Sequence, residues 1–218
     1  MQELIVENVS LQIKKTKLLQ DINLTLHSGK VYGLRGRNGS GKTVLMKCIC
    51  GFMKPTEGTI SINGKRVHKD VDFLPSAGII IEEPGFFPNY SGFQNLKILA
   101  GVQNRISNEK IRTMMELVGL DPAMKKPVGK YSLGMRQRLG IAQAVMEEPD
   151  ILILDEPTNG LDEDGVAWFR QFILEQKEKG KLILLASHSK EDVEMLSDEV
   201  YFMEKGNCYY EKGRLTAE

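Results

Sequence analysis

The segment 36–43 carries the residues best suited to bind a polyphosphate. Its letters, Gly-Arg-Asn-Gly-Ser-Gly-Lys-Thr, match the phosphate-binding pattern G-x-x-x-x-G-K-[ST] at every fixed position. Glycines allow a tight turn that aims backbone N–H groups inward, and the N-terminus of a helix predicted for residues 42–50 adds a partial positive charge. Lys42 is expected to reach the β- and γ-phosphates, and the Thr43 hydroxyl to bind Mg²⁺. The same letters could form a plain turn, but the apolar strand predicted for residues 31–34 favours nucleotide binding.

Two acidic residues end an apolar run later in the chain. Residues 151–154 are Ile-Leu-Ile-Leu, and Asp155 and Glu156 follow. Such a run is typical of a strand buried on both faces of a parallel sheet. Asp155 is expected to hold Mg²⁺ through water, and Glu156 to accept a proton from the attacking water. An isolated acidic pair could simply solvate a strand end, but the phosphate loop upstream favours chemistry.

A second helix is predicted to begin at Ser132, whose hydroxyl would cap it. Residues 131–135, Tyr-Ser-Leu-Gly-Met, resemble the signature of the nucleotide-binding subunits of ATP-binding cassette (ABC) transporters, usually Leu-Ser-Gly-Gly-Gln. Ser132 and Gly134 match that signature, and the other three positions depart from it. The form found here resembles cassettes associated with bacitracin-type antibiotic resistance and lantibiotic self-protection. Outside this context Ser132 would be an ordinary helix cap.

The resemblance covers essentially the whole chain and implies its fold. That fold is an α/β P-loop NTPase core with a mixed sheet, an antiparallel β subdomain and an inserted helical subdomain. We expect one ABC domain over residues 1–218, with a core lobe at about 1–82 and 147–218 and a helical lobe at about 83–146. The local patterns predict strands at 3–8, 21–26, 59–62 and 182–186, helices at 91–104, 107–118, 165–179 and 190–196, and hairpins at Asn63-Gly64 and around 205–207.

The resemblance also assigns roles to further residues. Asp162 matches the family's loop that bridges two ATP sites across a dimer, and His188, at the end of the strand 182–186, matches a histidine that contacts the γ-phosphate. Alone, His188 would be an ordinary polar loop residue. In the implied head-to-tail dimer, Ser132 and Gly134 of one subunit close over ATP held by the other. The predicted nucleotide contacts are Gly36, Arg37, Asn38, Gly39, Ser40, Gly41, Lys42, Thr43, Val44, Ile13, Ser132, Gly134 and Asp162; the catalytic residues are Glu156 and His188, and the metal-binding residues are Thr43, Glu82 and Asp155.

Three of these positions depart from the family pattern. Glu82 stands where the family usually has a glutamine that contacts Mg²⁺ and the lytic water, and a carboxylate can keep that metal contact. Ile13 stands where an aromatic side chain usually stacks on adenine; such stacking is worth about 1–3 kcal/mol, so weaker ATP binding and poor discrimination against GTP are expected. Val44 replaces a second hydroxyl residue that often contacts the α-phosphate.

Composition adds few constraints. Twenty-nine basic and twenty-nine acidic residues give zero formal charge, so no broad field argues for nucleic acid as a partner. Cys48, Cys50 and Cys208 are too few and too poorly spaced for a disulfide framework or a zinc site, which fits a reducing cytosol. No apolar run approaches the roughly 20 residues that span a bilayer.

The resemblance implies an enzyme, an ATPase with ATP and Mg²⁺ as ligands, that powers an exporter of a peptide antibiotic or other drug-like substrate. The implied partners are a transmembrane permease subunit and a second nucleotide-binding subunit, in a homodimer or heterodimer. The subunit would be cytoplasmic, held on the cytoplasmic face of the membrane by the permease. The permease is expected to dock beside Glu82, near the aromatic cluster Phe86, Phe87, Pro88 and Tyr90. The alternatives are a soluble ABC ATPase, acting for example in iron-sulfur assembly, on ribosomes or on DNA ends, and a nucleotide or small-molecule kinase.

Overall fold

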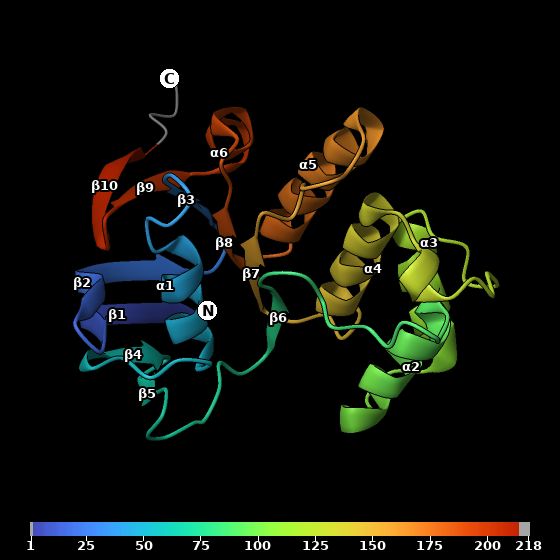
Figure 1. Ribbon diagram of the computed structural model, residues 1–218, viewed down its shortest axis with the longest axis horizontal. Coiled ribbons are helices and arrows are strands. Elements are labelled where there is room, and N and C mark those ends of the chain that lie inside the picture. Colours follow the sequence, from blue (N-terminus) through green and yellow to red (C-terminus); the bar gives the residue numbers. More distant parts are fainter. Residues whose placement is uncertain (1, 214–218) are drawn as a thin grey trace.

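A computed structural model of the protein describes residues 2–213, and it places ten strands in two sheets (Figure 1). The four-stranded antiparallel sheet has the order β2-β1-β4-β5, and the six-stranded sheet has the order β10-β9-β3-β8-β7-β6. The strands are β1 (Glu3–Ile13), β2 (Thr16–His27), β3 (Val31–Arg35), β4 (Glu57–Ile62), β5 (Lys65–Arg66), β6 (Ala77–Ile80), β7 (Ile151–Asp155), β8 (Leu182–Ala186), β9 (Glu199–Glu204) and β10 (Asn207–Gly213). The mixed-sheet α/β fold expected from the resemblance is therefore confirmed.

The large sheet is parallel through its centre. Strands β9, β3, β8, β7 and β6 pair in parallel, and β10 adds one antiparallel edge strand through the predicted hairpin. Alternate side chains of β7 face opposite hydrophobic clusters: Ile151 and Ile153 on one side, Leu152 and Leu154 on the other. This two-sided burial explains why the strand is an unbroken apolar run.

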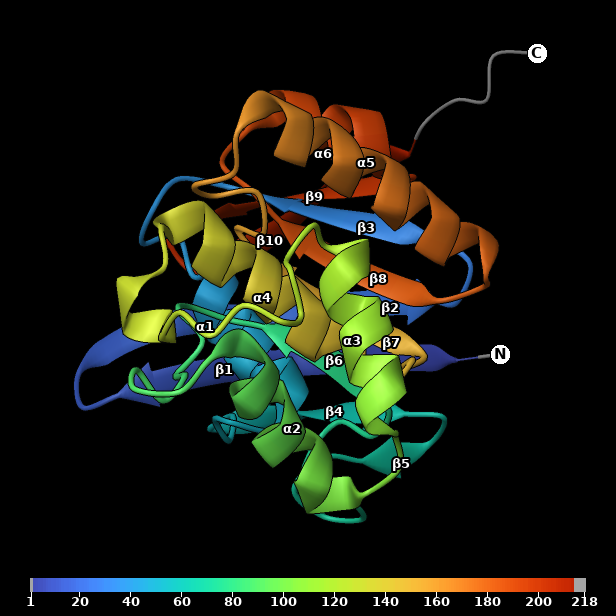
Figure 2. The ribbon, with the colours of Figure 1, turned by 90° about the vertical axis from the view of Figure 1, so that its right-hand side faces the viewer.

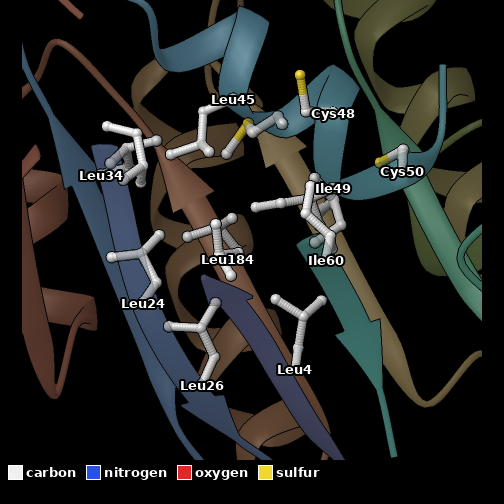
Figure 3. Close-up of a cluster of buried hydrophobic side chains, with 14 of the residues drawn as sticks. Leu4, Leu24, Leu26, Leu34, Leu45, Cys48, Ile49, Cys50, Ile60 and Leu184 are labelled. Carbon is white, nitrogen blue, oxygen red and sulfur yellow. The ribbon is translucent and has the colours of Figure 1, made fainter. Parts of the chain in front are cut away.

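Helix α1 (Lys42–Cys50) packs between the two sheets. Figure 3 shows its Leu45 and Ile49 in one buried cluster with Leu24 of β2, Ile60 of β4 and Leu184 of β8. Cys48 and Cys50 are buried free thiols in this cluster, and burial raises the pKa of Cys50 to about 12. The helix that begins at the phosphate loop is thus fixed by apolar contacts on both sides.

The helical lobe is inserted between β6 and β7 and comprises α2 (Gly92–Gln103), α3 (Asn108–Leu117), a short 3-10 turn at Val128–Lys130 and α4 (Leu133–Val145). Ser91 and Gln94 form a capping box at the start of α2, and the hydroxyls of Ser107 and Ser132 cap the next two helices. Figure 1 shows the three helices grouped at the end of the molecule away from β1 and β2. Two further helices, α5 (Glu163–Glu178) and α6 (Lys190–Leu196), belong to the core lobe and lie beside β3 and β8 (Figure 2).

The first hairpin is longer than the sequence patterns predicted. We expected strands at 3–8 and 21–26, whereas β1 and β2 continue to Ile13 and from Thr16. The register shifts repeatedly between Val6 and Gln12, and Asn8 and Asp21 adopt positive φ angles of 50° and 46°. Bulges of this kind break the alternation of apolar and polar residues on which the prediction depended.

Candidate nucleotide-binding site

The phosphate loop joins β3 to α1 and adopts a tight turn. Gly39 and Gly41 have φ angles of +79° and +113°, which side chains other than glycine rarely allow. Lys42 begins the helix, is only 6% exposed, and donates a hydrogen bond from Nζ to the Gly36 carbonyl oxygen over 2.7 Å. The N–H of Gly206, in the β9–β10 turn, donates to the Ser40 carbonyl at 2.9 Å and supports the loop from the other side. The loop therefore has the backbone geometry and the buried cation that a polyphosphate requires.

Thr43 and Asp155 meet beside this loop. The Thr43 hydroxyl donates to Asp155 Oδ2 over 2.5 Å, and Asp155 is 8% exposed. Burial above all raises the pKa of the Asp155 carboxyl, and the hydrogen bond from Thr43 opposes that rise. A cation at this position would favour the charged carboxylate. Two oxygen ligands suit Mg²⁺, which in phosphate sites takes its other ligands from phosphates and water.

Glu156 and His188 form a second pair at the ends of β7 and β8. The distance from His188 Nδ1 to Glu156 Oε2 is 2.6 Å, and the backbone N–H of His188 donates to the same oxygen over 3.2 Å. Glu156 has a positive φ of 49°, so the chain turns sharply where the strand ends. Glu156, the expected base, and His188, which is expected to touch the γ-phosphate, are therefore in direct contact.

The phosphate loop, Asp155 and Glu156 border a cavity of about 540 Å³, and His188 is not among its lining residues. The phosphate loop contributes residues 38–43, and Val44, Asp155 and Glu156 contribute further walls. The remaining lining residues were not predicted: Thr16, Lys17 and Leu18 at the start of β2, and Lys205 and Gly206 in the β9–β10 turn. Ile13 is the cross-strand partner of Thr16 and is 44% exposed, and it is not among the lining residues. Gly36 and Arg37 belong to the phosphate loop, but they do not line the cavity either.

Glu82 lies just beyond β6, with a positive φ of 61°. Its carboxylate contacts the Lys47 ammonium of α1 at 2.6 Å, and its side chain is 64% exposed. No sequence pattern predicted this partner, although Lys47 lies one turn beyond Thr43 on the same helix. Glu82 is therefore attached to the helix that carries the phosphate loop.

The predicted signature residues lie at the start of α4, against the loop that follows Glu156. The Ser132 hydroxyl accepts a hydrogen bond from the Met135 N–H at 3.2 Å, and Ser132 itself is exposed. A Cβ atom on Gly134 would lie 2.7 Å from the Gly160 carbonyl oxygen, so only glycine allows this approach. Neither residue lines the cavity around the phosphate loop.

Asp162 caps α5 and also joins it to the signature helix. Its Oδ1 accepts hydrogen bonds from the Gly165 N–H and from Arg138 Nη2, both over 3.1 Å. Arg138 also donates to the Val118 carbonyl at the end of α3. These contacts, which sequence reasoning missed, tie the loop at Asp162 to two helices of the helical lobe.

A larger cavity, of about 850 Å³, lies between the two lobes. The exposed rings of Phe52 and Phe73 pack edge to face on its core side, and Leu99 and Val102 of α2 line its helical side. The predicted docking cluster is near this groove but does not line it. Phe87 and Tyr90 are exposed and in edge-to-face contact, Pro88 is exposed, and Phe86 is partly buried against the core of the helical lobe.

The loop, the acids at the strand ends and the two-lobed fold define a P-loop ATPase of the cassette type. Residues 19–159 match the protein family described as ABC transporter, and the chain belongs to that family. It is 46% identical over 201 residues to the uncharacterized ABC transporter ATP-binding protein YybJ of Bacillus subtilis (strain 168), with 92% of each chain covered. It is thus an ATP-binding, ATP-hydrolysing subunit of the kind that powers a transporter.

A relative with a named substrate is similar over most of this chain. The bacitracin transport ATP-binding protein BcrA of Enterococcus faecalis is 42% identical over 207 residues, which are 94% of this chain and 67% of BcrA. This likeness agrees with the branch of the family indicated by residues 131–135. It does not favour a soluble ATPase outside transport.

The fold itself matches solved cassettes. The dimeric structure of MJ0796, a bacterial ABC transporter cassette, aligns with a TM-score of 0.85 at 20% identity, over 96% of this chain and 99% of that chain. Within residues 2–213, no helix combines the length and the apolar character needed to cross a bilayer.

Proposed function

We propose that this subunit hydrolyses Mg-ATP at the cavity between the phosphate loop and Asp155, and that hydrolysis drives export through a membrane permease. The observation that carries the proposal is the meeting of two pairs at the carboxyl edge of the parallel sheet, Thr43 with Asp155 and Glu156 with His188. These are the positions at which phosphoryl transfer needs a metal ligand set and a base.

Each side chain has a distinct task in the proposed reaction. Lys42 and the backbone N–H groups of the loop hold the phosphates, and Thr43 and Asp155 would hold Mg²⁺. Bound there, Mg²⁺ neutralises charge on the phosphate oxygens. Glu156 accepts a proton from the attacking water as the oxygen of that water bonds to the γ-phosphorus. The bond between the γ-phosphorus and the β–γ bridging oxygen breaks, and ADP leaves with its electron pair. His188 orients Glu156 and contacts the γ-phosphate.

The proposed active unit is a head-to-tail dimer. Ser132 and Gly134 lie outside the cavity that holds the phosphates, so in this proposal they act on ATP bound by another subunit. The exposed position of Ser132 and the described dimeric state of MJ0796 support this arrangement. The second subunit can be an identical chain or a related one.

We further propose that the permease docks in the groove between the lobes and on the aromatic pair beside it. Exposed aromatic side chains are enriched in the centres of interfaces. Asn95, 2% exposed, holds the loop of Phe87 and Tyr90 by hydrogen bonds to three of its carbonyl oxygens and one of its N–H groups. Asn95 therefore fixes the loop that presents the pair. In this proposal the docked permease would hold the subunit at the cytoplasmic face of the membrane. Peptide antibiotics such as bacitracin are the proposed class of exported substrate.

The test of hydrolysis is phosphate release by the purified chain with Mg²⁺ and ATP. Glu156→Gln should lower turnover by at least about 100-fold, because it removes the base, and ATP should remain bound. Glu178→Gln, an exposed acid at the end of α5, is the matched control and should keep full turnover. Full activity of Glu156→Gln would contradict the proposed role.

The test of docking is co-purification with the cognate membrane subunit. The double variant Phe87→Ala/Tyr90→Ala should reduce the yield of complex while the ATPase activity of the isolated subunit is kept. Tyr209→Ala, which removes an equally exposed ring from β10, is the control. An unchanged yield with the double variant would refute this docking site.

A further inference from the structure

The contact between Glu156 and His188 depends on two loops that leave different strands. Glu156 follows β7 and continues into residues 157–161, whereas His188 follows β8 and leads into α6. The sheet aligns the strand ends, because the Glu156 N–H donates to the Ala186 carbonyl over 2.9 Å. The backbone pairing of β7 with β8 ends at Asp155 and Ala186, so it does not extend to the two loops. The His188 side chain is 68% exposed, so packing alone does not hold it.

Asp192, in the first turn of α6, connects these two loops. Its Oδ2 accepts a hydrogen bond from the Thr158 hydroxyl at 3.1 Å, two residues beyond Glu156. Its backbone N–H donates to Ser189 Oγ at 3.2 Å, one residue beyond His188. Asp192 is 5% exposed, which is unusual for a carboxylate and requires a partner charge.

Arg170 of α5 supplies that charge. Its Nε donates to Asp192 Oδ1 over 2.8 Å, and its Nη2 lies 2.6 Å from the same oxygen. The hydrogen bond to Asp192 is the main cause that raises the pKa of the Arg170 guanidinium. Arg170 engages Oδ1 of Asp192, and Thr158 engages Oδ2. These contacts hold the carboxylate in one orientation and thereby fix the position of the Thr158 hydroxyl.

We propose that Asp192 is a positioning residue for ATP hydrolysis, which sets the spacing of Glu156 and His188 by holding Thr158 on one loop and the first turn of α6 on the other. The inference rests on the proposed ATPase function and adds to it a group that does not contact the nucleotide. A base displaced by about 1 Å can lose roughly 100-fold in rate. Weakening the bridge should therefore slow the chemical step and leave nucleotide binding intact.

The simpler role for Asp192 would be structural, as a buried ion pair that stabilises α6. A substitution at Thr158 distinguishes the structural role from the positioning role. Thr158→Val keeps the shape of the side chain, the Asp192–Arg170 pair and the Ser189 cap, and removes only the bridging hydroxyl. A structural role predicts an unchanged kcat for this variant, whereas the positioning role predicts a clear loss.

The experiment measures kcat and KM for ATP, together with the thermal unfolding midpoint, for five variants. Thr158→Val should lower kcat by about tenfold at an unchanged KM, and Thr158→Ser should restore kcat to within about twofold of wild type. Asp192→Asn should lower kcat similarly, and the double variant with Thr158→Val should be no slower than the slower single variant. Glu191→Gln is the matched control: it removes an exposed contact to the same Arg170 and should leave kcat unchanged.

The outcomes separate this inference from the proposed function. A wild-type kcat for Thr158→Val overturns the positioning role, as does a loss that Thr158→Ser fails to restore or that Glu191→Gln reproduces. A wild-type protein that releases no phosphate from Mg-ATP refutes the ATPase proposal itself, and the inference with it.

Discussion

The phosphate edge of the core lobe and the signature end of the helical lobe differ in how complete they are within one chain. At the phosphate edge, Lys42, Thr43 and Glu156 each contact a partner from the same lobe. At the signature end, Ser132 is exposed and Gly134 lies against the loop that contains Gly160. None of the residues that line the described phosphate cavity comes from α2, α3 or α4. The phosphate half of the site is therefore already assembled within one chain, whereas in the proposed dimer the lid would come from a second subunit.

The largest effect that would sharpen this contrast is expected at Gly134. Gly134→Ala adds a Cβ 2.7 Å from a backbone oxygen, and such overpacking costs about 1–3 kcal/mol. We expect ATPase turnover to fall by at least about tenfold, as the start of α4 shifts, while binding of a fluorescent ATP analogue to the monomer stays unchanged. Gly101→Ala, where a Cβ meets nothing within 4 Å, is the control. Equal loss of nucleotide binding and turnover would show that the two regions are not separate.

The two regions also differ in what their sequences revealed. The phosphate loop and β7 were predictable because each uses a short, contiguous pattern: glycines before Lys42, and an apolar run ending in Asp155. The cap at Ser132 was predictable for the same reason, since a capping residue acts on the next turn. The partners were not predictable: Lys47 for Glu82, Arg138 for Asp162 and Asp192 for Thr158 are brought together only by the fold.

The cavity wall formed by the β9–β10 turn and the first hairpin shows the same limit. Lys205-Gly206-Asn207 predicted a hairpin turn and nothing more, although Gly206 supports the phosphate loop and lines the cavity. Ile13 was assigned from its place in the family pattern, but bulges in β1 and β2 determine which residues of the hairpin reach the cavity. Contacts that depend on register across bulged strands leave no short pattern in the sequence.

The second prediction compares two adjacent acids beyond β6. Glu82 contacts α1 through Lys47, whereas Glu83 lines the groove between the lobes. Glu82→Ala should impair hydrolysis several-fold more than Glu83→Ala, because the family resemblance assigns a metal contact to Glu82 and none to Glu83. Phosphate release at saturating ATP, measured over a range of Mg²⁺ concentrations, decides between them. Equal effects of the two substitutions would count against the alignment of Glu82 with the family's glutamine.

The smallest effect is expected in recognition of the adenine or guanine ring of the nucleotide. No aromatic side chain lines the described cavity wall beside the phosphate loop. Since stacking on an aromatic ring is worth about 1–3 kcal/mol, affinities for ATP and GTP should differ by less than about tenfold. Competition titrations with both nucleotides measure the ratio, and Ile13→Tyr should tighten binding of both if that residue reaches the base. A preference for ATP above about 100-fold would show that another group recognises adenine.

The shared lid is tested most directly by the oligomeric state of Glu156→Gln with saturating Mg-ATP. Small-angle scattering with size-exclusion chromatography should find a dimer that is absent without nucleotide, and adding Ser132→Arg to Glu156→Gln should return it to a monomer while ATP stays bound. A Glu156→Gln protein that binds ATP and remains monomeric at every concentration tested would contradict the account.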